Sequence, residues 1–338
     1  MDDSKPVTPE RLMQLAWGYA PPLMLEAAIQ LKVFDSTEQG AKSLDQLTEA
    51  TGASKRGLRN LLDGLVGLDF LRKDAAGKYV NSPESSAFLV STKPSFQGAF
   101  FRHISGQLMP KWLTLTETVR TGKPSRAVNQ TEAGAKFFED FVEALFPLGF
   151  VPAQRVADAV GVPKLTSTFK VLDIAAGSGV WGIGVAVKSP HVQVTAVDWP
   201  GVIGVTKRVA ARHNLSDRFS FIEGDIGTAD FGNGYQLATL GHILHSEGES
   251  RSRQLLAKVY AALASGGTIA IAEFLVNDQR TAPPQSLIFA VNMLVNTDDG
   301  DAFSFEQIQS WLTHVGFRDV RSLDAPEAPS PLILATKP

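Results

Sequence analysis

The sequence predicts an α/β protein in which a helical N-terminal region precedes a parallel sheet covered by helices. Two observations carry this prediction. Up to about Phe88 the apolar residues recur at helical spacing in short segments, whereas from Thr168 onward short β-branched segments alternate with helical ones. Such alternation is typical of parallel sheets, because each parallel connection needs a crossover that packs on one face. We divide the chain into residues 1–93, 94–164 and 165–338.

Composition narrows the classes of protein to which the chain can belong. Its 338 residues are enough for two domains, since single cores rarely grow beyond about 250–300 residues. A formal net charge of −3 gives no general attraction to nucleic acid or an anionic membrane. The absence of cysteine excludes disulfides and thiolate metal sites. A polar start and the lack of any apolar run of bilayer length favour a soluble, cytoplasmic protein.

Residues 1–93 have the pattern of a winged helix. Ser43 opens a capped helix, a turn follows, and Lys55 to Leu68 form a second helix. Residues 70–80 then read as two short strands around a tight turn. DNA-binding regulators share this outline and stay an alternative, although acidic residues offset most of the basic ones. The apolar segment from Trp17 to Phe34 indicates burial against a second subunit instead, so we expect a homodimer and no nucleic-acid partner.

Residues 94–164 are again helical in periodicity and are rich in phenylalanine. We interpret them as a helical connector whose aromatic rings pack between helices, with a few lining an apolar substrate pocket. These residues are Phe96, Phe100, Phe101, Phe137, Phe138, Phe141, Phe146 and Phe150.

Seven segments within residues 165–338 have the length and composition of strands. Helical segments separate the first five, whereas the last two follow one another as a hairpin-like pair. The segments are Phe169 to Ala175, Val192 to Val197, Phe219 to Ile222, Tyr235 to Leu240, Thr268 to Ala272, Arg318 to Leu323 and Leu332 to Thr336. A seven-stranded sheet is therefore expected.

Three successive strands end in residues suited to a nucleoside. The first runs into Gly177 and Gly179, and such a turn lets the backbone pass close to a ligand. The second ends at Asp198, where a carboxylate can accept both hydroxyls of a ribose. The third ends at Gly224 and Asp225, where an acid or its neighbouring amide can bond an adenine edge.

The same glycine turn also satisfies G-x-G-x-x-G, the fingerprint of dinucleotide-binding oxidoreductases. Asp173 argues against a dinucleotide, because a charge inside the first strand would repel a pyrophosphate. The ammonium group of S-adenosylmethionine would instead be attracted, directly or through water. The adenine contact expected at Asp225 also has no part in the dinucleotide fingerprint. We favour S-adenosylmethionine as the cofactor and keep NAD-dependent oxidoreduction as an alternative.

The ordered set of segments around these residues resembles the small-molecule O-methyltransferases of the caffeic acid and acetylserotonin type and their bacterial relatives. The segments are 172–179 (LDIAAGSG), 197–200 (VDWP), 224–226 (GDI), 243–245 (ILH) and 272–274 (AEF). The resemblance covers nearly the whole chain. It implies a winged-helix-like dimerisation domain, a helical connector and a Rossmann-like class I methyltransferase domain.

Together, position and resemblance define a candidate cofactor site. Its residues are Asp173, Ala175, Gly177, Asp198, Trp199, Gly224, Asp225, Ile226, Gly241 and His242. By the resemblance, Asp198 holds the ribose, and Asp225 with Ile226 flanks the adenine. Gly241 stands where plant members have a lysine near the donor, so that contact is missing or comes from His242.

The resemblance also implies two catalytic residues. His245 matches the family's general base, and Glu273 matches one of two acids that flank it. A phenol with a pKa of about 10 is mostly neutral near neutral pH, so a base that takes its proton makes it a better nucleophile. The second acid would fall near Ala302 and is absent, with Asp301 beside it. We expect methyl transfer to a phenolic or enolic hydroxyl of a small, largely apolar molecule.

Several alternatives stay open at this point. The missing acid and lysine leave room for a C-methyltransferase or a non-methylating relative of the same fold. His245 could merely cap a helix that begins near Ser246. His242 and His245 lie near acidic residues, but their segment lacks a regular ligand spacing, so we expect no metal site. Residues 298–301 resemble part of a calcium loop without its remaining ligands.

Overall fold

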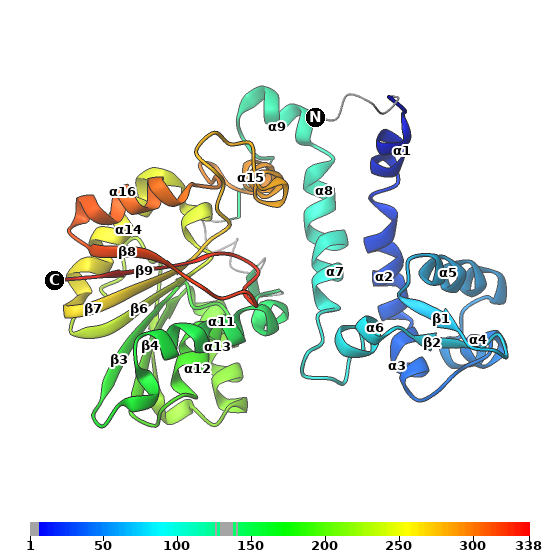
Figure 1. Ribbon diagram of the computed structural model, residues 1–338, viewed down its shortest axis with the longest axis horizontal. Coiled ribbons are helices and arrows are strands. Elements are labelled where there is room, and N and C mark those ends of the chain that lie inside the picture. Colours follow the sequence, from blue (N-terminus) through cyan, green and yellow to red (C-terminus); the bar gives the residue numbers. More distant parts are fainter. Residues whose placement is uncertain (1–6, 126, 129–137, 140) are drawn as a thin grey trace. The chain divides into compact units, whose positions relative to one another are not determined.

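Short amphipathic helices separated by glycine and polar turns build the first of two units into which the chain divides, residues 1–109 and 110–338. The computed structural model describes residues 7–125, 127–128, 138–139 and 141–338 (Figure 1). The elements of the first unit are α1 (Glu10–Ala16), α2 (Ala20–Gln30), α3 (Val33–Glu38), α4 (Leu44–Thr51), α5 (Lys55–Gly67), β1 (Leu71–Lys73), β2 (Tyr79–Asn81), α6 (Pro83–Phe88) and α7 (Ala99–His103).

The predicted order of helix, turn, helix and hairpin is confirmed in this unit. Ser43 and Gln46 form a reciprocal capping box at the start of α4, which satisfies two backbone N–H groups that lack a helical partner. Leu58, Leu62 and Leu65 of α5 are buried in the core of the unit. Strands β1 and β2 pair antiparallel directly after this helix.

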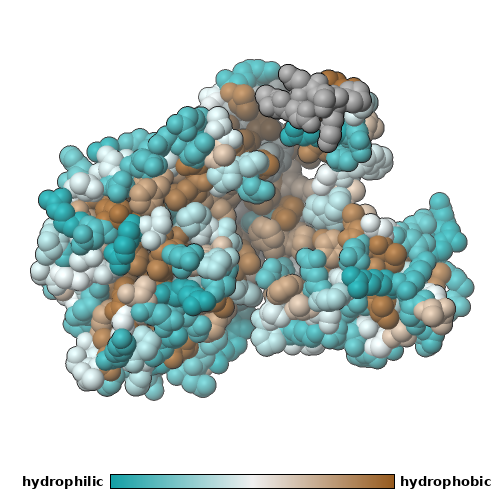
Figure 2. All heavy atoms as spheres, viewed as in Figure 1, coloured by the Kyte–Doolittle hydropathy of each residue, from teal (hydrophilic) through white to brown (hydrophobic). Residues whose placement is uncertain are grey.

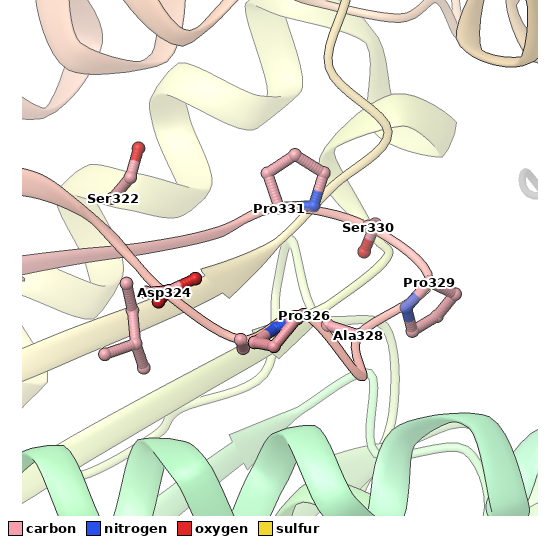
Figure 3. Close-up of a pocket in the computed structure, with 9 residues that line it drawn as sticks. Ser322, Asp324, Pro326, Ala328, Pro329, Ser330 and Pro331 are labelled. Atoms are coloured by element: carbon pink, nitrogen blue, oxygen red, sulfur yellow. The ribbon is translucent and has the colours of Figure 1, made fainter.

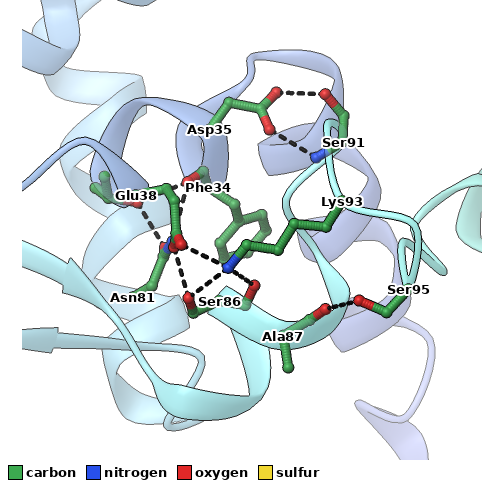
Figure 4. Close-up of polar contacts among 10 residues, drawn as sticks. Phe34, Asp35, Glu38, Asn81, Ser86, Ala87, Ser91, Lys93 and Ser95 are labelled. Atoms are coloured by element: carbon green, nitrogen blue, oxygen red, sulfur yellow. Dashed lines mark hydrogen bonds and ion pairs between the residues drawn. The ribbon is translucent and has the colours of Figure 1, made fainter.

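A cluster of ion pairs and hydrogen bonds joins α3 and α6 to the segment that leaves the first unit's core (Figure 4). The Nζ atom of Lys93 donates to Glu38 at 2.5 Å and to the backbone oxygen of Ser86 at 2.6 Å. The bond from Lys93 lowers the pKa of Glu38 to about 2. Asp35 accepts from both the backbone N–H and the hydroxyl of Ser91. These contacts fix residues 91–95 against the helices that precede them.

A run of helical segments follows and crosses the boundary between the two units. These segments are α7, the π-helical turn Ile104–Leu108, α8 (Met109–Trp112) and α9 (Leu115–Thr121).

All seven predicted strands are present in the second unit. They are β3 (Phe169–Ile174), β4 (Val192–Asp198), β5 (Phe219–Glu223), β6 (Tyr235–Gly241), β7 (Leu263–Ala272), β8 (Arg318–Leu323) and β9 (Leu332–Thr336). They form one sheet in the order β5-β4-β3-β6-β7-β9-β8. The first five run parallel, and β9 is antiparallel to both of its neighbours, so the hairpin-like pair at the end of the chain is confirmed.

Helices cover both faces of this sheet because successive strand residues point to opposite sides. Val171 packs with the helices on one face, and Leu172 packs with those on the other. The first face carries α11 (Phe146–Ala159), α12 (Val180–Ala186) and α13 (Pro200–Arg212). The second carries α14 (Leu244–Ala262) and α16 (Phe305–Val315), and α15 (Pro284–Asn296) contacts α14 and α9.

The strand order places β3 between β4 and β6, so the chain crosses to one side of β3 first and to the other side later. In open sheets of this kind, ligands bind beyond the carboxyl ends of the strands at this switch point. The face of the molecule in Figure 2 is mostly hydrophilic, with smaller hydrophobic areas. In the part of the chain that the structure describes, no helix is long and apolar enough to cross a bilayer.

Candidate active site

The glycine turn after β3 follows a path that few residues other than glycine adopt. Ala175, Gly177 and Gly179 all have positive φ angles of 52°, 58° and 77°. A side chain on Gly179 would collide with Thr206 of α13. The hydroxyl of Thr206 donates to the backbone oxygen of Gly177 at 2.7 Å and so holds the turn from behind.

Asp198, at the end of β4, joins three backbone segments at this edge. Its carboxylate accepts the N–H groups of Gly177 and Trp199, both at 2.8 Å. Its backbone oxygen accepts the N–H of Gly224 at 2.9 Å, which fixes the end of β5. Burial raises the pKa of Asp198 to about 6. The structure thus brings the glycine turn and the ends of β4 and β5 together around one carboxylate.

Asp173 lies near the end of β3, just before the glycine turn. One carboxylate oxygen accepts the N–H of Gly182 at 2.9 Å, and the other accepts the hydroxyl of Thr239 at 2.8 Å. Its side chain is fully buried, and burial raises its pKa to about 7. These bonds tie β3 to α12 and β6. The attraction of an ammonium group by Asp173, directly or through water, stays a prediction.

The segment after β5 places Asp225 and Ile226 at the same edge. The Oδ1 atom of Asp225 accepts the N–H of Gly227 at 2.6 Å. Within the described residues, its Oδ2 atom has no hydrogen-bond partner. Ile226 is buried at 8% exposure. The end of β5 is therefore followed by a carboxylate oxygen that can still accept a hydrogen bond, on Asp225, and by the apolar side chain of Ile226.

Trp181 of α12 packs against Gly241. Gly241 is the position at which, by the resemblance, plant members have a lysine. A methyl group on Gly241 would overlap the Nε1 edge of the indole. The adjacent His242 has a φ of 61° and hydrogen-bonds through Nε2 to Ser330 at 2.7 Å. Burial lowers the pKa of His242 to about 4. Trp181 is not among the candidate site residues taken from the sequence. The contact between a large residue of one element and a glycine of another leaves no pattern in the local sequence.

Ser330 comes from the loop between β8 and β9, which also folds over a hollow of about 520 Å³ (Figure 3). The hollow is lined by Ser322, Leu323, Asp324, Ala325, Pro326, Ala328, Pro329, Ser330 and Pro331. The same loop accepts the backbone N–H of Glu273 through the oxygen of Pro331. The loop therefore forms hydrogen bonds with two residues of the candidate site, His242 and Glu273.

His245 and Glu273 form a buried pair at the ends of β6 and β7. The Nδ1 atom of His245 lies 2.7 Å from Oε2 of Glu273. The backbone N–H of His245 donates to the other oxygen at 3.3 Å. Burial favours the neutral form of Glu273, but the interactions with His245 and His242 together outweigh burial, and the pKa of Glu273 is lowered. A carboxylate on Nδ1 fixes the tautomer with its lone pair on Nε2, which makes no hydrogen bond to the described residues.

The alternative that His245 caps a helix is wrong. Helix α14 begins at Leu244, and its N-cap residue, Ile243, makes no side-chain cap bond. His245 therefore lies inside the first turn, before a break at Gly248.

Asp301 does not take the place of the absent second acid. Its carboxylate pairs with Arg280 at 2.8 Å and accepts the N–H of Ala302. Only its backbone N–H reaches His245, where it bonds to the backbone oxygen at 2.9 Å. No metal-binding group of three or more His, Asp or Glu residues occurs in the described ranges.

Aromatic rings surround His245. Phe289 of α15 meets the imidazole edge-on at 4.8 Å between ring centroids, and Phe274 lies 4.4 Å from Phe289. From the connector, Phe146 stacks on His213 and Phe150 meets the same ring at a tilt, which is packing, as expected for most of that set. Phe138 meets Trp199 edge-on at 5.9 Å, and Phe137 lies outside the described residues.

Comparison with known proteins identifies this arrangement. A family model described as the O-methyltransferase domain matches residues 112–318, and one described as the O-methyltransferase dimerisation domain matches residues 13–91. The chain belongs to the S-adenosylmethionine-dependent O-methyltransferases.

Individual relatives of this O-methyltransferase span nearly its full length. The 3-hydroxy-5-methyl-1-naphthoate 3-O-methyltransferase of Streptomyces sahachiroi is 29% identical, over 93% of this chain and 91% of that protein. The acetylserotonin O-methyltransferase of Gallus gallus is 28% identical, over 93% of each. A solved structure from Nostoc punctiforme, assigned to the O-methyltransferases, has a TM-score of 0.90 at 30% identity and covers 98% of this chain and 100% of its own.

Family membership also decides between the two cofactors that the glycine turn allowed. The O-methyltransferase uses S-adenosylmethionine, so the match to the dinucleotide fingerprint is a coincidence of a short motif.

Proposed function

We propose that the enzyme transfers a methyl group from S-adenosylmethionine to a phenolic or enolic hydroxyl of a small, largely apolar molecule. His245 acts as the general base, and Glu273 orients it. The observation that carries this proposal is the buried His245–Glu273 pair, which leaves Nε2 of the imidazole unpaired at the sheet edge that holds the glycine turn.

The hydrogen-bond acceptors at this edge fit the cofactor. A carboxylate can accept about four hydrogen bonds, two on each oxygen. In Asp198 each oxygen accepts one backbone N–H, so about two acceptor positions remain for the ribose hydroxyls. The unpaired Oδ2 of Asp225 suits the adenine amino group, with Ile226 against the ring. Ala175, Gly177, Trp199, Gly224, Gly241 and His242 complete the set, and Asp173 supports the turn. The bound cofactor supplies an electrophilic methyl group on a sulfonium.

The residues around His245 account for the rest of the chemistry. Nε2 takes the proton of the acceptor hydroxyl, and the resulting imidazolium is stabilised by the carboxylate of Glu273 on Nδ1. Phe274 and Phe289 provide an aromatic wall beside the base, which favours an apolar, ring-containing acceptor. The naphthoate named for the Streptomyces sahachiroi relative is such a molecule.

The atom that is methylated can be tested directly. We expect a panel of phenols and naphthols, incubated with methyl-labelled S-adenosylmethionine, to yield at least one product with the label on oxygen, because removal of the hydroxyl proton by His245 leaves negative charge on the oxygen that lies next to the base. Mass spectrometry and NMR of the product distinguish an O-methyl from a C-methyl group. Products labelled only on carbon would replace this proposal by C-methylation.

We also propose that the N-terminal unit forms a homodimer. Its first helices expose large apolar side chains, among them Leu12 at 70%, Leu15 at 67% and Trp17 at 63%. Contiguous exposed apolar residues mark interaction surfaces. This surface overlaps the residues that match the dimerisation model.

Charges placed on this surface should separate the subunits. We expect Leu12→Asp combined with Leu15→Asp to convert a dimer into a monomer, because two carboxylates would have to be buried unpaired. Light scattering coupled to gel filtration measures the mass. Val187→Asp, at an exposed apolar position of the other unit, is the matched control and should stay dimeric. A wild-type monomer at micromolar concentration would contradict the proposal.

A further inference from the structure

One lysine of α14 forms hydrogen bonds with three backbone oxygens of the segment after β5. The Nζ atom of Lys258 donates to the backbone oxygens of Ile226, Gly227 and Ala229 at 2.8, 2.9 and 2.9 Å. An ammonium group has three N–H donors, so all of them are used. Lys258 also lies over the ring of Phe231 at 4.3 Å, the next large residue of the same segment. We call residues 225–231 the adenine segment.

A second cation of α14 reaches the side chain at the start of this segment. The Nη2 atom of Arg251 lies 3.5 Å from Oδ1 of Asp225. Its Nε donates to Glu247 at 2.6 Å, and Glu247 is buried at 5% exposure. Glu247 precedes the break at Gly248 and stands two residues after His245. Arg251 therefore bridges the turn that carries the proposed base and the acid proposed to read the adenine.

We propose that Lys258 and Arg251 are positioning residues that set the affinity and base selectivity of the cofactor site by fixing the adenine segment. The inference rests on the proposed role of Asp225 and Ile226 at the adenine. Without Lys258, three convergent carbonyl groups lose their shared donor and must turn toward water. Without Arg251, the Asp225 carboxylate loses its link to Glu247. The loss of Lys258 touches neither the reacting atoms nor the turn that carries His245, so its effect falls on cofactor binding and leaves the chemical step intact.

Substitution of Lys258 tests the first part. Lys258→Met keeps most of the apolar stem and removes the ammonium group. We expect about tenfold weaker binding of S-adenosylhomocysteine by calorimetry, since hydrogen bonds from a charged group are among the stronger ones. The KM for S-adenosylmethionine should rise similarly, while kcat at saturating donor stays within about twofold. Arg253→Met is the matched control, because Arg253 lies on the same helix and pairs only with the exposed Glu249 among the described residues.

Substitution of Arg251 tests the second part and provides a variant if Lys258→Met fails to fold. The wild type should prefer S-adenosylhomocysteine over S-inosylhomocysteine, in which a carbonyl replaces the amino group whose hydrogen bond Asp225 would accept. We expect Arg251→Gln to reduce this preference at least about threefold, because the carboxylate is less firmly held. A residue that only stabilises the fold would change the melting temperature and leave the ratio unaltered.

The outcomes separate this inference from the function on which it rests. If Lys258→Met and Arg251→Gln bind both ligands as the wild type does while Asp198→Ala loses affinity, the positioning role is wrong and the cofactor site stands. If Asp198→Ala also binds normally, the proposed cofactor site itself is wrong. If Arg253→Met weakens binding as much as Lys258→Met, the loss of affinity comes from removing any positive charge on α14, and the inference fails.

Discussion

We expect the His245→Ala enzyme to turn over its acceptor at least about 10²-fold more slowly than the wild type, because positioned bases typically contribute 10² to 10⁴ in rate. The affinity for S-adenosylhomocysteine should change little, since His245 faces the proposed acceptor and its Nδ1 bonds to Glu273. Turnover is measured with labelled donor at saturating concentrations of both substrates, and affinity by calorimetry.

Glu273→Gln serves as the companion variant. An amide can still pack at this position, which is only 2% exposed, but it carries no charge to stabilise the imidazolium. A large loss of kcat with unchanged cofactor affinity would support the orienting role. Full activity of His245→Ala with intact folding, checked by its melting temperature, would remove His245 from the base role.

The sheet and its edge could be predicted because both depend on local sequence. Most of the strands are short apolar runs, several of them rich in β-branched residues, and the parallel order of the first five follows from the helices between them. The carboxyl ends of parallel strands meet at one edge, so Gly177, Asp198 and Asp225 could be placed near one another before any contact was known. The hydrogen bond from Gly177 to Asp198 is a direct expression of that rule.

Contacts between distant elements could not be predicted in this way. Asp173 stands opposite Thr239 in the register of β3 with β6, and only this pairing shows that its carboxylate bonds inside the protein. Gly241 contacts Trp181, which lies 60 positions earlier in the chain (241 − 181). The interaction of Lys258 with three backbone oxygens carries no sequence signal, because a carbonyl group is present at every residue.

The remaining large effect is expected at Asp198. We expect Asp198→Ala to weaken the binding of S-adenosylhomocysteine by more than about tenfold, since the ribose would lose its acceptors and the N–H groups of Gly177 and Trp199 would lose their partner. Calorimetry measures the dissociation constant. Asp217→Ala, an exposed acid beside the opposite end of β5, is the matched control and should bind normally.

The raised pKa of Asp198 adds a pH dependence with a definite sign. Because burial raises this pKa to about 6, the carboxylate is ionised above that pH and gains a proton as the pH falls through it. An ionised acid is the stronger acceptor for hydroxyl groups, so cofactor affinity should be highest above pH 6 and should decline below it. Asp198→Asn has the same shape and no proton to gain, so its weaker affinity should be flat across the same range. A wild-type affinity that is equally flat would show that the charge of Asp198 has no part in holding the ribose.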